Sequence, residues 1–195
     1  LTCTLRAAAQ DVTTVVMQPA EAQFGVGQET TLEIAIRGAV KLYAIELQLT
    51  YDPAVVEVVD DEDATPGVQV ALAEGFLKPE FVVQNEADNG SGVVRLAFTQ
   101  LAPSAAANGD GVVATVRLRG KAAGTSAVSF AEVVLANDEA LPVPAGTSPG
   151  TVVVGGGGTA PAPQPTATSQ SAQPAAIGTP TLPASGAPAA GPASA

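Results

Sequence analysis

Acidic side chains are the residues of this sequence best suited to chemistry, and they gather in one run, Asp60-Asp61-Glu62-Asp63. Carboxylate oxygens are the ligands that hard cations such as calcium prefer. The run lacks the alternating ligands and the central glycine of an EF-hand loop. A solvated loop is therefore the favoured interpretation, and Asp138 with Glu139 is likewise interpreted as a turn.

Groups for the common catalytic mechanisms are sparse. The sequence contains no His, which excludes catalytic triads and metal sites built on imidazole. It contains no phosphate-binding loop and no dinucleotide fingerprint. Two carboxylates could still hydrolyse a glycoside, but no pair of acids has a spacing that points to such a site. We therefore expect no enzymatic activity, no cofactor and no metal bound by this chain.

The net charge of −11 argues against nucleic acids and anionic membranes as partners. Nucleic-acid binding requires clustered Lys and Arg to neutralise phosphates, and an anionic membrane surface would repel this chain. No apolar run approaches the roughly 20 residues needed to cross a bilayer. We expect neither nucleic-acid binding nor membrane insertion.

The chain divides into three parts by composition. Residues 1–10 end in an Ala-x-Ala pattern that signal peptidase accepts, so they are interpreted as the end of a signal or targeting segment, or as a disordered N-terminus. Residues 11–155 carry nearly all the charge and form one predicted domain. Residues 156–195 are uncharged and rich in Gly, then Pro, Ala, Thr and Ser, which predicts a disordered linker.

A strict alternation from Leu42 to Thr50 is the strongest structural signal in the sequence, and it continues to a Pro-terminated corner and a further apolar run ending at Val59. The period of two predicts a half-buried strand. Its inward side chains are Tyr43, Ile45, Leu47, Leu49 and Tyr51, and its outward ones are Ala44, Glu46, Gln48 and Thr50.

Similar short patterns recur along residues 11–155 without any convincing helical period. About nine strands are expected, including one that ends at Gly38, and residues 19–27 are interpreted as a loop. Residues 76–84 are read as an edge strand or an irregular crossing. Fold class is therefore all-β, a sandwich with Greek-key or jelly-roll crossings.

The outward row of the Leu42–Thr50 strand is the candidate functional surface. It is polar but lightly charged, and such a sheet face can dock a protein; an ordinary wet face is the equally weighted alternative. Sugar binding requires exposed aromatic platforms, and both tyrosines fall on the inward face.

Four blocks in this order resemble a cohesin domain, the receptor module for dockerin-bearing enzymes. They are Ala44–Val58 with its Tyr-Asp-Pro motif, Asp110–Arg117, Val128–Phe130 with Ala136–Asp138, and Gly150–Val154. The resemblance implies a nine-stranded jelly-roll sandwich without enzymatic activity, in a secreted or cell-surface protein.

The resemblance also implies a partner and a site. The partner is a calcium-loaded dockerin on a protein such as a polysaccharide-degrading enzyme, with the calcium bound by the partner. The implied contacts are Ala44, Glu46, Gln48, Thr99 and Gln100, with Asn85 at the margin. The alternatives are a carbohydrate-binding module that holds polysaccharide directly, because the two sandwich types are related, and a structural spacer.

Overall fold

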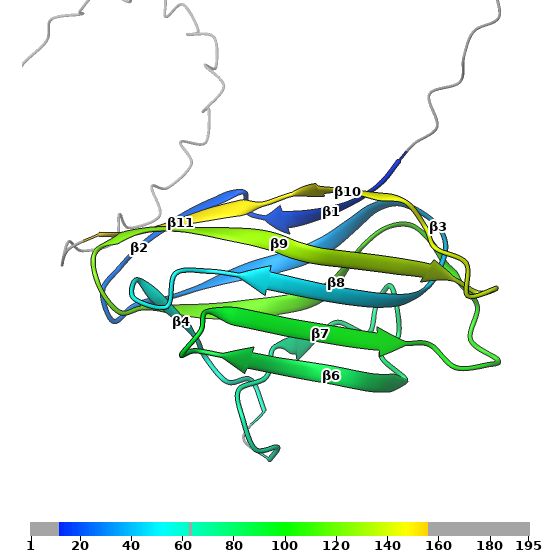
Figure 1. Ribbon diagram of the computed structural model, residues 1–195, viewed down its shortest axis with the longest axis horizontal. Coiled ribbons are helices and arrows are strands. Elements are labelled where there is room, and N and C mark those ends of the chain that lie inside the picture. The colour runs from blue at the N-terminus through cyan, green and yellow to red at the C-terminus, as the bar shows by residue number, and fades with distance from the viewer. Residues whose placement is uncertain (1–11, 63, 156–195) are drawn as a thin grey trace, which may run out of the picture. The chain divides into compact units, whose positions relative to one another are not determined.

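The computed structural model describes residues 12–62 and 64–155. All the regular secondary structure in these residues is β-strand. The predictions for residues 1–10 and 156–195 lie outside the described residues. Within the described ranges there is no helix long and apolar enough to span a bilayer. The strands (Figure 1) are β1 (Thr13–Gln18), β2 (Glu21–Gly25), β3 (Glu29–Thr50), β4 (Val56–Val58), β5 (Ala71–Leu72), β6 (Phe81–Asp88), β7 (Val93–Thr99), β8 (Ala107–Gly120), β9 (Gly124–Asn137), β10 (Ala145–Ser148) and β11 (Gly150–Gly155).

Strand β3 is 22 residues long and belongs to both layers of the fold. Its first half pairs with β1 and β8, and its second half pairs with β7 and β9. The register against β8 shifts between Ile36 and Leu42, where Gly38 and Lys41 have φ angles of 62° and 52°. The sequence predicted two strands separated at Gly38. That break is a bulged corner instead, because a bulge bends a strand without ending it.

The eleven strands of the described residues are joined by hydrogen bonds into one sheet, which curls into two layers. One layer has the order β10-β1-β3-β8, with β4 and β5 also paired to β8. The other has the order β6-β7-β3-β9 (Figure 1). Strand β11 pairs with the first part of β9 and lies parallel to β2. This arrangement confirms the all-β sandwich with jelly-roll crossings.

Apolar side chains between the layers form the core, and most are aliphatic. Ile45, Leu47, Leu49 and Tyr51 are buried, as the alternation predicted. Tyr43 is only half-buried and Leu42 is fully buried instead. The register against β9 shifts between Leu42 and Ala44, so the alternation does not extend back through Tyr43. The largest fully buried side chains are Phe98, Met17, Leu32, Ile34, Ile36, Leu42, Leu47, Leu49, Leu77, Leu96, Leu118 and Leu135.

Two short strands, β2 and β10, have no counterpart among the predicted strands. Strand β2 lies in the region interpreted as a loop, and β10 has the weakly β-forming sequence Ala-Gly-Thr-Ser. Each is parallel to a strand distant in sequence, β2 to β11 and β10 to β1. Their conformation therefore comes from tertiary pairing, which routinely overrides local propensity.

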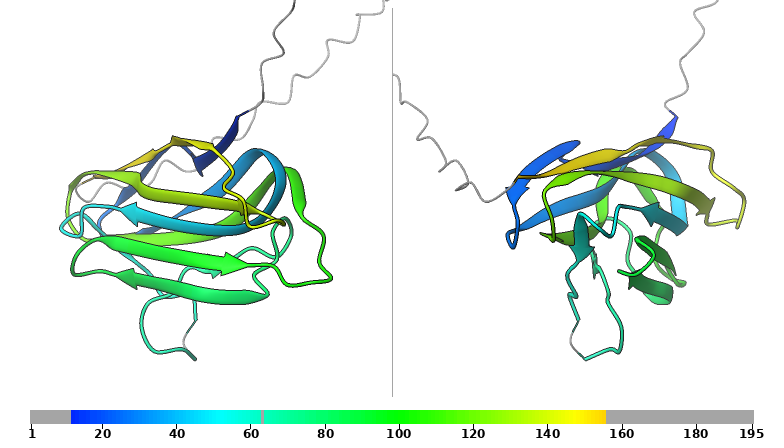
Figure 2. Two further views of the ribbon diagram at one scale, coloured as in Figure 1. Left: turned by 45° about the vertical axis from the view of Figure 1, so that its right-hand side comes forward. Right: turned by 60° about the vertical axis from the view of Figure 1, so that its left-hand side comes forward.

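Two asparagine side chains attach the segment after the Asp52-Pro53 corner to the second layer. Asn89 accepts from Val58 N at 2.7 Å and donates to Val58 O at 2.9 Å, and its Oδ1 also accepts from the Tyr51 hydroxyl at 2.6 Å. Asn85 makes the same pair of bonds with Val70, at 3.0 and 2.9 Å. Each amide thus replaces one step of a β-ladder. Between these two attachments the chain projects from the layers (Figure 2).

Glycine is required at the turn from β6 to β7, and a pair of substitutions tests this. Gly92 has a φ of 70°, and a Cβ there would lie 2.3 Å from Tyr51 O. Gly109 has a φ of 90° with nothing within 4 Å of the same position. We expect Gly109→Ala to cost about 1 kcal/mol of unfolding free energy for the backbone alone, and Gly92→Ala about 3 kcal/mol or more because the backbone must also move. Equal costs in urea unfolding would contradict this account.

Burial raises the pKa of Tyr51 to about 12, with nearby Asp88 and Glu57 adding to the rise. An unfolded tyrosine ionises near 10, so the folded state binds this proton more tightly. The Tyr51 contribution is therefore complete below about pH 10 and is lost as pH rises from about 10 to 12. We expect this loss to be at most about 2 kcal/mol after allowance for solvent screening. Urea unfolding across this pH range should show a shallower decline in Tyr51→Phe; identical slopes would refute the assignment.

Candidate functional site

The outward face of the β6-β7-β3-β9 layer, here called the four-strand face, carries most of the predicted contact residues. Directly paired residues on neighbouring strands share a face, so the register defines rows across it. The first row is Phe81, Thr99, Ala44 and Ala136; the second is Gln84, Ala97, Glu46 and Val134; the third is Glu86, Arg95, Gln48 and Glu132. Each row takes one side chain from each strand.

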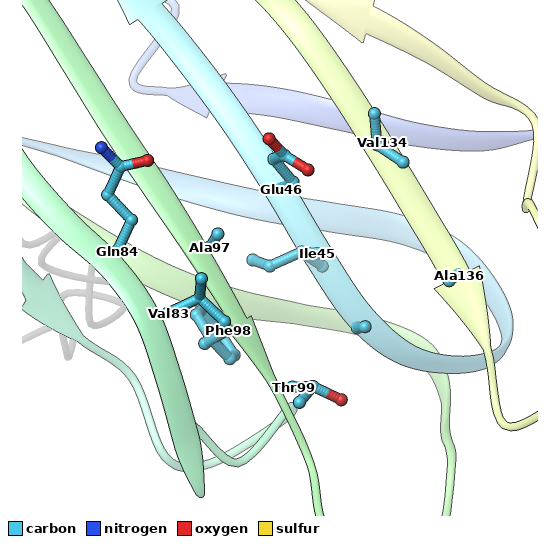
Figure 3. A pocket seen from close by; sticks show the side chains of 10 residues that line it. Ile45, Glu46, Val83, Gln84, Ala97, Phe98, Thr99, Val134 and Ala136 are labelled. Atoms are coloured by element: carbon cyan, nitrogen blue, oxygen red, sulfur yellow. The ribbon is translucent and has the colours of Figure 1, made fainter. Parts of the chain in front are cut away.

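A hollow lies over the first two rows. It is lined by Ala44, Ile45, Glu46, Val83, Gln84, Ala97, Phe98, Thr99, Val134 and Ala136. Figure 3 shows the Glu46 carboxylate on β3 between β7 and β9, with Ala97 on one side and Val134 on the other. Three of the lining side chains are alanine. The hollow exists because these three outward positions carry only a methyl group each. Glu46 is exposed and is the one charged residue of the lining.

The third row borders the hollow with longer, polar side chains. Arg95 of β7 is the strand partner of Glu86 of β6, and Gln48 of β3 lies between Arg95 and Glu132 of β9. Among the described residues, no carboxylate lies within 4.0 Å of the Arg95 guanidinium. This row therefore offers two acids and one base to a partner, beside the acid of Glu46.

The rim at the Thr99 end of the face is fixed by two side chains that join neighbouring loops. Glu80 accepts from Leu101 N and from the Ser104 hydroxyl, both at 2.6 Å, and these bonds hold its pKa below the usual value for glutamate. Gln100 accepts from Lys78 N at 3.3 Å and donates to Ala105 O at 2.9 Å. The chain before β6 and the chain after β7 are thereby held together.

Four of the six predicted contact residues share the four-strand face: Ala44, Glu46, Gln48 and Thr99. Gln100 does not, because it is 3% exposed and its amide is engaged by backbone. Asn85 is half-buried with its amide bonded to both polar groups of Val70. In this structure both amides position the surrounding chain, and a contact of either residue with a partner stays a prediction.

Sequence reasoning missed the residues that neighbouring strands add to the hollow. Ala97 lies on β7, Val134 and Ala136 lie on β9, and Val83 with Gln84 lies on β6. The alternation of Ala97 with buried Leu96 and Phe98 is visible in the sequence and indicates an outward position. What one sequence does not show is that β7 and β9 flank the second half of β3.

Asp60 and Asp61, the first two residues of the acidic run, interact with other groups of this chain. Asp60 accepts from Gln69 N at 2.9 Å and from Glu62 N at 3.2 Å, and these bonds hold its pKa below the usual range. Arg117 donates to Asp60 O and lies 3.9 Å from the Asp61 carboxylate. Within residues 12–62 and 64–155 there is no group of three metal-ligating side chains placed to share an ion.

A positioning role for Gln100 is testable by stability. Gln100→Ala removes two hydrogen bonds from a buried side chain and should cost about 2 kcal/mol of unfolding free energy. Gln84→Ala, on the face itself, should stay within about 0.5 kcal/mol of the parent chain. Chemical denaturation of both variants makes the comparison, and the prediction fails if Gln84→Ala is the more destabilised.

Comparisons with known proteins identify the family. A model described as cohesin domain matches residues 13–154, whereas a comparison with curated proteins found no match. A type I cohesin–dockerin complex from Clostridium thermocellum has a TM-score of 0.61 at 16% identity, covering 77% of this chain and 99% of that one. CaCohA2 from Clostridium acetobutylicum has a TM-score of 0.57 at 19% identity, covering 73% and 91%.

A non-cellulosomal cohesin from the hyperthermophilic archaeon Archaeoglobus fulgidus has a TM-score of 0.54 at 21% identity, covering 73% of this chain and 91% of that one. At these identities the structural likeness establishes the fold, and the family model establishes the membership. Because that model spans nearly all the residues of the two-layered sandwich, this chain belongs to the cohesin domain family.

Proposed function

We propose that this cohesin domain is a non-catalytic docking module that binds a dockerin-type module of another protein through the four-strand face. The observation that carries the proposal is the exposed Glu46 carboxylate in a hollow of small side chains at the centre of that face. The predicted contacts Ala44, Gln48 and Thr99 lie around it.

The physical character of the face supports a protein partner. Strand pairing fixes the backbone of all four strands, so the face is formed before binding and loses little conformational entropy on association. The face mixes apolar and polar side chains, and non-obligate interfaces are likewise about as apolar as the rest of a protein surface. Several similar solved structures are cohesin–dockerin complexes, which supports a dockerin as the partner class here.

A dockerin partner also implies where the calcium is bound, what kind of protein carries the dockerin and where the complex forms. The partner carries its own calcium and belongs to a protein such as a polysaccharide-degrading enzyme. The assembly operates outside the cell or at its surface. The net charge of −11 favours a partner whose contacting surface is basic.

Direct polysaccharide binding is the second candidate function, and the face offers little for it. Carbohydrate modules stack sugars on exposed aromatic rings. Phe81, 55% exposed, is the single exposed aromatic side chain among the described residues. One ring does not form a platform, so a protein partner is favoured.

Charge reversal at Glu46 tests the docking surface. Each variant of the full chain is titrated calorimetrically with a panel of purified, calcium-loaded dockerin modules. Glu46→Lys should weaken the tightest pair by at least about tenfold, because reversal of a central interface charge typically costs 1.4 kcal/mol or more. Glu33→Lys is the matched control, since Glu33 is exposed on the same strand but in the other layer, and it should leave binding unchanged.

Three outcomes would overturn the proposal. The first is that no dockerin of the panel binds. The second is that Glu33→Lys weakens binding as much as Glu46→Lys. The third is retention of the chain on insoluble cellulose or in affinity gels with soluble polysaccharides, without any protein partner, which would favour the carbohydrate-binding alternative.

A further inference from the structure

Two Asn-Gly dipeptides occur in the sequence, Asn89-Gly90 and Asn108-Gly109. An asparagine side chain before glycine is prone to lose its amide, because glycine has no Cβ to hinder attack by its own backbone nitrogen. The two dipeptides share this local chemistry. Their surroundings in the fold therefore decide which of them reacts.

Asn89 and the nitrogen that follows it are both restrained. The Asn89 amide makes two hydrogen bonds with the backbone of Val58 and accepts a third from the Tyr51 hydroxyl. Gly90 N, the nitrogen that would attack, donates to Asp88 Oδ1 at 2.8 Å. Ring closure at Asn89 would break the ladder-like pair of bonds and would also have to free a nitrogen that is bonded to a carboxylate.

Asn108 and Gly109 are exposed where β8 crosses the bulged corner of β3. The register between these strands shifts on either side of the pair Ala39 and Gly109, so the ladder restrains the backbone less here than in a regular sheet. Gly109 has a φ of 90°, and no atom beyond its chain neighbours lies within 4 Å of the position that a Cβ would take. Rotation that brings Gly109 N towards Asn108 Cγ therefore meets little resistance.

The hydrogen bonds of the Asn108 amide also oppose the reaction less. Its Oδ1 accepts from Lys41 N at 2.9 Å, and this bond stabilises the negative charge that Oδ1 gains as the ring closes. Its Nδ2 donates to Ala106 O at 3.2 Å on the exposed surface, where water replaces it at little cost. Asn89 Oδ1 has donors too, but no side chain of the described residues accepts from Gly109 N in the way that Asp88 accepts from Gly90 N.

We propose that Asn108 is a site of spontaneous deamidation. Gly109 N gives its proton to a base in the solvent and forms a bond to Asn108 Cγ. The bond between Cγ and Nδ2 then breaks, and Nδ2 takes up a proton and leaves as ammonia. Water, the co-reactant, opens the cyclic imide at either carbonyl. One opening gives aspartate at position 108, and the other gives isoaspartate, whose main chain runs through Cβ and Cγ.

The two products act differently on the corner of β3. Aspartate keeps an oxygen that accepts from Lys41 N, whereas isoaspartate lengthens the main chain by a methylene group and moves its carboxylate. Lys41 has a φ of 52°, which is unfavourable for a residue with a Cβ, and its bond to Asn108 helps to hold that conformation. Isoaspartate should therefore raise the unfolding equilibrium constant about fivefold, as expected for the loss of one hydrogen bond.

Peptide mapping by mass spectrometry tests the proposal on the full chain. The folded chain is aged in mildly alkaline water labelled with heavy oxygen and is then digested in ordinary water, so only conversion during ageing carries the label. Asn108 should convert at least about tenfold faster than Asn89, because more hydrogen bonds must open at Asn89. In guanidinium chloride the two rates should agree within about threefold, because the protection given by structure is lost.

Variants test the assigned roles. Gly109→Ala places a methyl group beside the attacking nitrogen and should slow conversion of Asn108 without changing Asn89. Asp88→Ala is the converse variant, since it frees Gly90 N, and it should speed conversion of Asn89 alone. Chemical denaturation should show that aged chains with isoaspartate at position 108 are less stable than Asn108→Asp, which keeps the acceptor for Lys41 N.

Four outcomes would overturn the proposal. They are equal conversion of the two asparagines in the folded chain, faster conversion of Asn89, absence of label at Asn108 while it accumulates in the unfolded chain, and conversion of Asn108 that Gly109→Ala does not slow. The last outcome would mean direct hydrolysis of the side chain. None of these measurements involves a binding partner, so their result is independent of the dockerin panel.

Discussion

The pairing of β3 with four strands is the constraint on which the rest of this structure depends. Its first half lies between β1 and β8, and its second half lies between β7 and β9. The corner at Gly38 and Lys41 lets one continuous strand supply the centre of both layers. The inward side chains of both halves meet in the same core, so the outward side chains of the second half are held at fixed positions. The proposed docking surface therefore depends on the packing of the core.

Much of this fold could be predicted because its main strands alternate cleanly. Ile45, Leu47 and Leu49 are buried as the period of two requires. The prediction lost accuracy where non-local pairing decides the conformation. The short strands β2 and β10 exist through parallel partners, and the bulged corner of β3 is stabilised by bonds from distant residues, such as Asn108 Oδ1 accepting from Lys41 N. Neither kind of contact leaves a periodic signal in the sequence.

The candidate site, like the fold, could be predicted only where the signal lies within one strand. Periodicity placed Glu46 outward, and the resemblance to cohesin domains gave the surface a role. Gln100 was included because the resemblance implies polar contact residues at the end of β7, yet the chain leaves the strand there and its amide bonds to the backbone of Lys78 and Ala105. The alanines of the hollow are weak signals one by one. They become a site only when β7 and β9 are known to flank β3.

Strand β6 is an outer strand whose edge is partly covered by the chain itself. As the outer strand of its layer it would offer backbone groups for another strand to pair with, the usual start of aggregation. Its edge is occupied where Asn85 and Ala87 bond to Val70 and Val68. Farther along, the register shift at Val83 interrupts the ladder. The edge of this layer is therefore less open to the addition of a strand than its broad side is to contact.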